Sequence, residues 1–174
     1  MTAILTMGID PSLTSTGVSV GGATSSIRPV LNGVPRLIEI RNAIVNLVSE
    51  HDIQVVAIEG YSYGSRNSHA HSLGELGGVV RVALYERGIP FVDIPPTVRA
   101  KFATGKGNAG KSEVVSAVSA KTGLVWSGGD GADRCDAWIM EQILLTKFGN
   151  SPYDWGAGQM DALAKVEWGG VVGV

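Results

Sequence analysis

Four carboxylates in this sequence have the residue types and the spacing to hold divalent metal ions. Asp10 and Glu59 each end a short apolar run of the kind that forms a buried strand, where a charge is costly unless it is paired or binds a metal. Asp133 and Asp136 are three residues apart, so on a helix they project from one face. Mg²⁺ or Mn²⁺ prefers carboxylate oxygen and water. We therefore interpret these four residues as the catalytic and metal-binding residues of a two-ion site for phosphodiester hydrolysis.

A neighbouring acid leaves the register of this site open. Asp130 also stands three residues from Asp133, in the segment GGDG that precedes the helix. An Asp in that position is typical of a helix N-cap. We favour the pair Asp133 and Asp136, because the apolar residues 137–140 that follow Asp136 would anchor this turn of the helix in the core.

Alternating and unbroken apolar runs predict the elements that carry these acids. Strands are expected at 4–9, 17–20, 25–30, 54–58 and 90–94, and helices at 35–50, 72–87, 97–103, 112–121 and 131–148. The first three strands form an antiparallel meander and the other two are parallel, which gives a mixed five-stranded α/β sheet with helices on both faces. Active sites in such sheets gather at the carboxyl ends of central strands, where Asp10 and Glu59 fall.

Length and composition favour a globular, soluble protein. The chain has 174 residues, 44% hydrophobic and 17% charged, and no apolar run approaches the roughly 20 residues of a membrane span. Neither a secretory signal nor a second cysteine beside Cys135 is visible, so we expect a cytoplasmic protein. We divide it into a nuclease domain at 1–149 and a C-terminal tail of unknown role at 150–174.

The charge distribution favours DNA as the partner. The formal net charge of −2 argues against nucleic-acid binding when taken alone. However, the stretch 60–125 carries eight Lys or Arg residues against four Asp or Glu residues. This local excess predicts a surface that contacts phosphates.

Several segments, in order and spacing, resemble the RuvC-type Holliday junction resolvases, particularly phage-encoded relatives. These segments are GIDPSLTSTG (8–17), VVAIEGYSYG (55–64), GELGGVVR (74–81), GKGNAGKS (105–112) and DGADRCDAW (130–138). The resemblance covers roughly 4–148. It implies an RNase H-like fold, a homodimer, and paired nicks across a four-way junction, with Asp10, Glu59, Asp133 and Asp136 matching the family's catalytic acids.

The resemblance also implies residues that bind DNA. The family places an aromatic residue after the second acid, where Tyr61 and Tyr63 both flank the expected position. It places one basic residue at the start of the penultimate helix, which Lys111 matches. It places another ahead of that helix, and three residues compete for this position: Arg99, Lys101 and Lys106. Arg66 belongs to the same basic region and is expected to contact the arms of the junction.

Other readings of the sequence lead to other functions. GKGNAGKS, which begins at Gly105 and ends at Ser112, also fits the P-loop pattern of nucleotide-binding proteins. A P-loop should follow a buried strand, whereas this segment follows a helical stretch. An actin-like sugar kinase would be much longer, and a non-catalytic DNA-binding module would not need four acids. A broader nickase of flaps or forks remains the alternative within the nucleases.

The helix expected at 72–87 contains small residues that suit close contact with another surface. Gly residues weaken a helix by up to about 1 kcal/mol each relative to Ala, which suggests close backbone approach. The surface beside them is either the dimer partner or the protein's own sheet. The residues concerned are Leu73, Gly74, Leu76, Gly77, Gly78, Val80 and Leu84.

Overall fold

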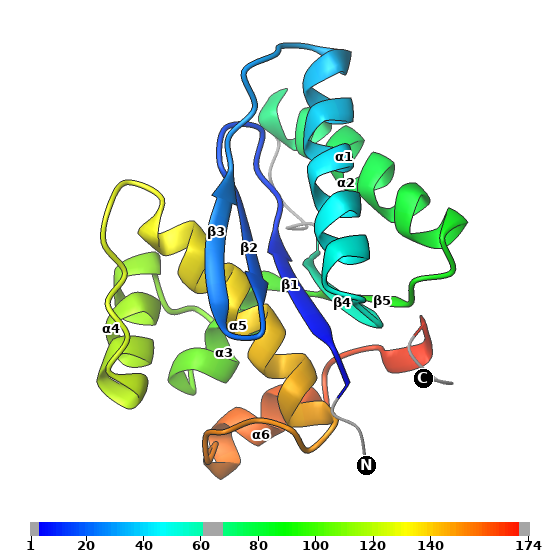
Figure 1. Cartoon of the computed structure of the whole chain (residues 1–174). Coiled ribbons are helices and arrows are strands. Elements are labelled where there is room, and N and C mark those ends of the chain that lie inside the picture. Colours follow the sequence, from blue (N-terminus) through cyan, green and yellow to red (C-terminus); the bar gives the residue numbers. More distant parts are fainter. Residues whose placement is uncertain (1–3, 61–67, 171–174) are drawn as a thin grey trace.

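A computed structural model describes residues 4–60 and 68–170. Its sheet has five strands in the order β3-β2-β1-β4-β5. The first three strands are antiparallel, whereas β4 and β5 run parallel to β1. The expected mixed sheet is therefore confirmed (Figure 1). The strands are β1 (Thr6–Asp10), β2 (Thr16–Val20), β3 (Ala23–Ile27), β4 (Val55–Glu59) and β5 (Phe91–Ile94).

Helices cover both faces of the sheet, also as expected (Figure 1). One face packs against α1 and α2, and the other against α3, α4, α5 and α6. Side chains of β4 alternate between the two cores, because successive residues of a strand point to opposite faces. The described helices are α1 (Val34–Glu50), α2 (Ser68–Glu86), α3 (Pro96–Thr104), α4 (Lys111–Thr122), α5 (Gly131–Lys147), α6 (Ala157–Leu163) and the 3₁₀ turn η1 (Trp168–Gly170).

Strand β3 begins and ends earlier than the sequence indicates. Gly21 and Gly22 both have positive φ, at 59° and 81°, as two-residue hairpin turns require. The turn therefore pairs Val20 with Ala23. β3 consequently ends at Ile27 rather than at Val30, which is exposed.

Two glycines let α5 lie directly on the sheet. A Cβ added at Gly8 would sit 2.0 Å from the carbonyl oxygen of Ala137, and one added at Gly17 would sit 2.3 Å from that of Asp133. Any larger residue at either position would push the helix away from β1 or β2. These contacts set the height of α5 above the sheet, and thus the position of the acids that it carries.

The C-terminal region is more ordered than the sequence indicates. It contains α6 and η1, and Trp155, Ala162, Leu163 and Val166 are buried in the same core as α3 and α5. Across the described residues, no helix has the length and apolar character needed to cross a membrane.

Candidate active site

Two of the four acids lie side by side at one edge of the sheet. Asp10 is the last residue of β1 and Glu59 the last of β4. The two strands are parallel neighbours in which Ile9 is paired with Ile58, so the next residue of each strand arrives at the same level. Asp10 is buried and Glu59 is half-buried.

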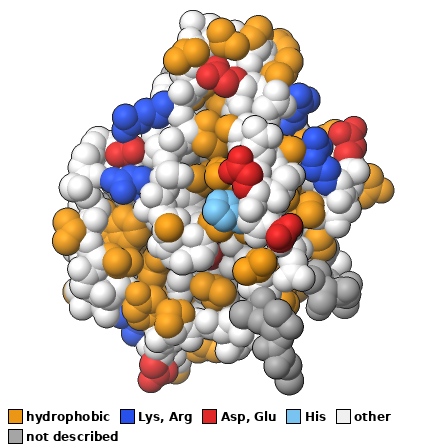
Figure 2. All heavy atoms as spheres, viewed as in Figure 1, with side chains coloured by type: hydrophobic (Ala, Val, Ile, Leu, Met, Phe, Trp, Pro, Cys, Tyr) orange, Lys and Arg blue, Asp and Glu red, His pale blue; other side chains and the backbone are white. Residues whose placement is uncertain are grey.

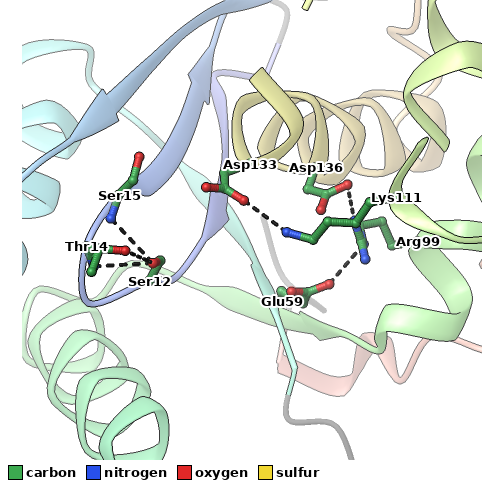
Figure 3. Close-up of polar contacts among 8 residues, drawn as sticks. All are labelled: Ser12, Thr14, Ser15, Glu59, Arg99, Lys111, Asp133 and Asp136. Carbon is green, nitrogen blue, oxygen red and sulfur yellow. Dashed lines mark hydrogen bonds and ion pairs between the residues drawn. The ribbon is translucent and has the colours of Figure 1, made fainter. Parts of the chain in front are cut away.

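Helix α5 brings the other two acids to this edge (Figure 3). Asp136 is buried and forms an ion pair with Arg99 of α3, whose Nε also lies 2.9 Å from Oε1 of Glu59. Asp133 lies nearer the start of α5 and pairs at 3.0 Å with Nζ of Lys111. Arg99 thus stands between an acid of the sheet and an acid of the helix, and Lys111 stands at the rim.

Burial and the neighbouring carboxylates raise the pKa of two of these acids, Asp10 and Asp136. Burial, repulsion from Glu59 and Asp136, and a hydrogen bond with Glu59 hold the pKa of Asp10 well above its ordinary value of 3.8, although Arg99 acts in the opposite direction. Burial also raises the pKa of Asp136 to about 6, against the lowering effect of Arg99. The pocket therefore favours any cation that neutralises these carboxylates.

The structure separates the three basic residues that compete in the sequence. Arg99 is buried; burial lowers its pKa, but Glu59, Asp136 and Asp10 raise it by more. Lys101 is half-buried on the same helix, and residues two apart do not share a face. Lys106 is exposed and pairs with Glu113 at 3.1 Å. Arg99 alone of these three lies among the acids.

The four carboxylates are of a kind that binds a divalent ion, although in this structure two of them enclose the guanidinium of Arg99. Within residues 4–60 and 68–170, no group of three or more His, Cys, Asp or Glu side chains is arranged to hold a metal ion. Arg99 lies between Glu59 and Asp136 and neutralises them instead. Oδ2 of Asp136 is buried without a hydrogen-bond partner in the described part of the chain. An all-carboxylate set with such an oxygen suits Mg²⁺ or Mn²⁺.

A turn rich in hydroxyl groups follows Asp10 and faces the acids (Figure 3). The backbone N–H groups of Thr14 and Ser15 donate to Oγ of Ser12. The Thr16 hydroxyl donates to the Ser12 carbonyl and accepts from the Ser12 N–H. These hydrogen bonds fix the chain between β1 and β2, and Leu13 in the same turn packs against the core on the α1 and α2 side. The composition LTST is the signal in the sequence that points to this turn.

Asp130 stands at the N-cap position of α5, as expected, but its side chain does not cap the helix. Its carboxylate instead accepts from the Ser26 hydroxyl at 2.6 Å and pairs with Arg28 at 2.9 Å and Arg134 at 3.5 Å. A hydroxyl of β3 and two arginines, one just after β3 and one on α5, take up the carboxylate in place of the helix N–H groups. Asp130 therefore ties β3 to α5 and lies outside the acidic pocket.

Glu141 is a buried acid beyond the four that the sequence pattern indicates. It lies on α5, fully buried, and accepts hydrogen bonds from the Ser19 hydroxyl at 2.6 Å and the Gly22 N–H at 3.0 Å. Burial raises its pKa above 4.5, although these hydrogen bonds lower it. The signal was its position five residues after Asp136 in an otherwise apolar stretch.

Some expected residues remain outside this description. Tyr61, Tyr63 and Arg66 lie outside the described residues. GKGNAGKS follows α3 rather than a strand, with Gly105 ending that helix in a left-handed conformation, so the context of a P-loop is absent there. Cys135 is buried, as expected of a lone apolar thiol.

Comparisons with known proteins agree with this geometry. Residues 6–137 match the sequence model of the family described as crossover junction endodeoxyribonuclease RuvC. The chain is 32% identical to the protein of that name from Corynebacterium diphtheriae, over 75% of this chain and 87% of that protein. It is 30% identical to the one from Rhodococcus jostii, over 79% and 82%.

Solved structures show the same fold. Thermus thermophilus RuvC superposes with a TM-score of 0.65 and 23% identity, over 84% of this chain and 98% of that one. The T. thermophilus RuvC structure in complex with a Holliday junction substrate gives 0.64 and 22%, over 84% and 97%. The expected RNase H-like fold is therefore confirmed. By sequence match, fold and the placement of its acids, this chain belongs to the crossover junction endodeoxyribonuclease RuvC family.

Proposed function

We propose that this protein is a metal-dependent endonuclease that hydrolyses phosphodiester bonds of four-way DNA junctions, one strand per protomer of a homodimer. The observation that carries the proposal is the meeting of Asp10, Glu59 and Asp136, which come from two parallel strand ends and a helix, in a chain of the resolvase family. These acids are far apart in the sequence and repel one another where they meet. Their carboxylates can stay ionised together only when a cation neutralises them, and a divalent metal ion does this.

The four acids would hold the metal in this proposal. Asp10 and Asp136 would be the central ligands, Glu59 would orient the nucleophile, and Asp133 would complete the site. When bound, Mg²⁺ or Mn²⁺, as a pair of ions, would activate a water and stabilise the leaving oxygen. Ligation requires that Arg99 release Glu59 and Asp136, its present partners.

The basic side chains divide into two roles. Arg99 is buried among the acids. We therefore propose that it neutralises the acids when no metal is bound and the charge of the reacting phosphate during cleavage, and that it does not contact the arms of the DNA. Lys111 keeps 63% of its side chain exposed beside Asp133, which suits it to contact a phosphate next to the cut. Lys106 is exposed in the loop that leads from α3 to α4. Phosphate contacts of this kind set position rather than sequence.

The surface between α1 and α2 is our candidate for the homodimer interface. It contains a hollow of about 770 Å³ lined mainly by apolar groups, including Val34, Gly78 and Val82. A Cβ added at Gly78 would meet nothing within 4 Å, so this glycine does not serve packing on its own sheet. Leu76, Val80 and Leu84, by contrast, are buried within the protomer. Hydrophobic side chains also gather over the start of α1 (Figure 2).

A panel of DNA substrates tests the proposal and its runner-up. Purified protein is incubated with a four-way junction, a flap, a Y-fork and linear duplex, each with Mg²⁺ or with a chelator. We expect paired nicks in the four-way junction only when Mg²⁺ is present. Equal cutting of flaps and forks would favour the broader nickase, and cutting that persists in chelator would refute the metal-dependent site.

A further inference from the structure

The segment 151–166 follows the stretch that matches the family and packs across the two helices that carry the Arg99–Asp136 ion pair. Its buried members are Trp155, Ala162, Leu163 and Val166. In Figure 1, α6 lies beneath the end of α5, and it packs closely on α3. The segment thus touches both sides of the acidic pocket from outside it.

On the α3 side, the contact is one helical turn from Arg99. The rings of Phe102 and Trp155 lie with their centroids 4.4 Å apart at 44°. Phe102 is three residues after Arg99, so both side chains project from neighbouring positions on one side of this nine-residue helix. A shift of Phe102 would therefore move the guanidinium relative to its two carboxylates.

On the other side, the same segment is anchored to α5 and α4. Trp155 Nε1 donates to the hydroxyl oxygen of Ser151 at 3.0 Å, and that hydroxyl lies 3.3 Å from Oε1 of Gln142 on α5. Lys121 of α4 donates to the carbonyl of Asp154 at 2.6 Å and lies 4.9 Å from the centre of the Trp155 ring. Trp155 is therefore held from two helices while its ring presses on the third.

We propose that segment 151–166 is a positioning brace that sets α3 against α5 and so fixes where the Arg99 guanidinium stands at the acidic pocket, both when it pairs with Glu59 and Asp136 and when it releases them to the metal and neutralises the reacting phosphate. Trp155 is its positioning residue and touches neither DNA nor metal. The inference rests on the proposed role of Arg99 in cleavage. Displacements of about 1 Å remote from the chemistry can cost about 100-fold in rate, so a brace of this kind is expected to act on turnover more than on DNA binding.

A double-mutant cycle in the full-length protein tests the brace. Cleavage of the four-way junction in Mg²⁺ is measured for Trp155→Ala, Arg99→Ala and the double variant, with kcat and KM determined separately. We expect Trp155→Ala to lower kcat about 10-fold with little change in KM, and to have no further effect once Arg99 is gone. Trp155→Phe should restore most of the rate, because a ring still packs on Phe102.

Two further variants separate positioning from loss of stability. Lys121→Met removes one anchor of the segment without opening a cavity, and it should lower kcat by a smaller factor that also disappears in the Arg99→Ala background. Ile44→Ala removes buried volume from the opposite core and should leave kcat unchanged at a temperature where the protein is folded.

The outcomes distinguish this inference from the proposed function. If Arg99→Ala cleaves like the wild type, the role of Arg99 and the brace both fail. If Arg99→Ala lowers kcat but Trp155→Ala and Lys121→Met do not, or if the effects of Trp155 and Arg99 multiply, the brace is wrong and the nuclease proposal stands.

Discussion

Arg99 neutralises two carboxylates of the acidic pocket when no divalent ion is bound. Its guanidinium faces Glu59 and Asp136 and stands in for a metal ion. Removing one partner of a buried ion pair leaves the other charges uncompensated, which typically costs about 3 kcal/mol or more. The sequence could not single out this residue, because spacing alone leaves Arg99, Lys101 and Lys106 equivalent.

The first prediction concerns this exchange of cations. Arg99→Gln should lower the thermal stability of the protein in chelator, and Mg²⁺ should stabilise the variant more than it stabilises the wild type, because the acids then have no internal cation. Thermal unfolding with and without Mg²⁺ measures both effects, with Lys101→Gln as the matched control on α3. Equal Mg²⁺ shifts in Arg99→Gln and wild type would contradict the exchange.

A second prediction concerns the buried acid Glu141. Burial raises its pKa above 4.5, so the ionised side chain is less favourable in the folded protein than in the unfolded chain. Its contribution to stability is therefore present below pH about 4.5 and is lost as the pH rises through the folded-state pKa. Glu141→Gln does not titrate, so the wild type should lose stability relative to this variant as the pH rises.

Urea unfolding of both proteins between pH 4 and pH 7 measures this difference. A difference that stays constant, or that changes in the opposite direction, would show that Glu141 does not titrate as described. Glu141→Ala should be destabilised throughout, by about 1–3 kcal/mol, because the Ser19 hydroxyl and the Gly22 N–H lose their acceptor.

At the scale of elements, the height of α5 above the sheet decides where its acids stand. Gly17 lies against the backbone of Asp133, whose carbonyl oxygen would be only 2.3 Å from a Cβ at this position. Gly17→Ala should force the helix outward and lower cleavage about 10-fold or more, with a cost in stability of about 1–3 kcal/mol from overpacking. Gly129→Ala, in open space in the loop before α5, is the control. Junction cleavage and urea unfolding measure the two effects, and wild-type cleavage by Gly17→Ala would contradict the role of this contact.

The sequence predicted the elements well wherever one periodicity dominated. The apolar run before Glu59 and the helical spacing of 35–50 match β4 and α1 within one residue. Asp10 and Glu59 could be placed together because parallel strands end at a common edge. The boundary of β3 and the side-chain partners of Asp130 could not be predicted, because they depend on a hairpin register and on two arginines, one just after β3 and one on α5.

At the scale of the whole molecule, the C-terminal segment belongs to the core. The stretch 150–174 shows no clear period in the sequence, yet aromatic residues join this segment to α5: Trp138 contacts both Tyr153 and Trp155. We infer that the folded domain extends at least to Val166, which is buried. Irregular segments pack through single large side chains, and periodicity does not detect these.

The proposed homodimer is also a feature of the whole molecule. Val82 of α2 is 57% exposed beside the apolar hollow, and a stable dimer interface buries about 1,600 Å² in total. Val82→Glu should convert the proposed dimer to a monomer, whereas Val125→Glu, at an exposed valine between α4 and α5, should not. Sedimentation velocity measures the mass. A monomeric wild type, or a Val82→Glu protein that remains dimeric, would contradict this interface.

The central claim is that acids far apart in the chain form one hydrolytic site, and amide substitutions test it most directly. Nicking of a four-way junction in Mg²⁺ and junction binding in chelator are measured for Asp10→Asn and Asp136→Asn, with Asp130→Asn as the control from the start of the same helix. Both site variants should lose cleavage by about 100-fold or more while still binding the junction, and the control should cleave like the wild type. Wild-type cleavage by either site variant, or loss of cleavage in Asp130→Asn alone, would contradict the account.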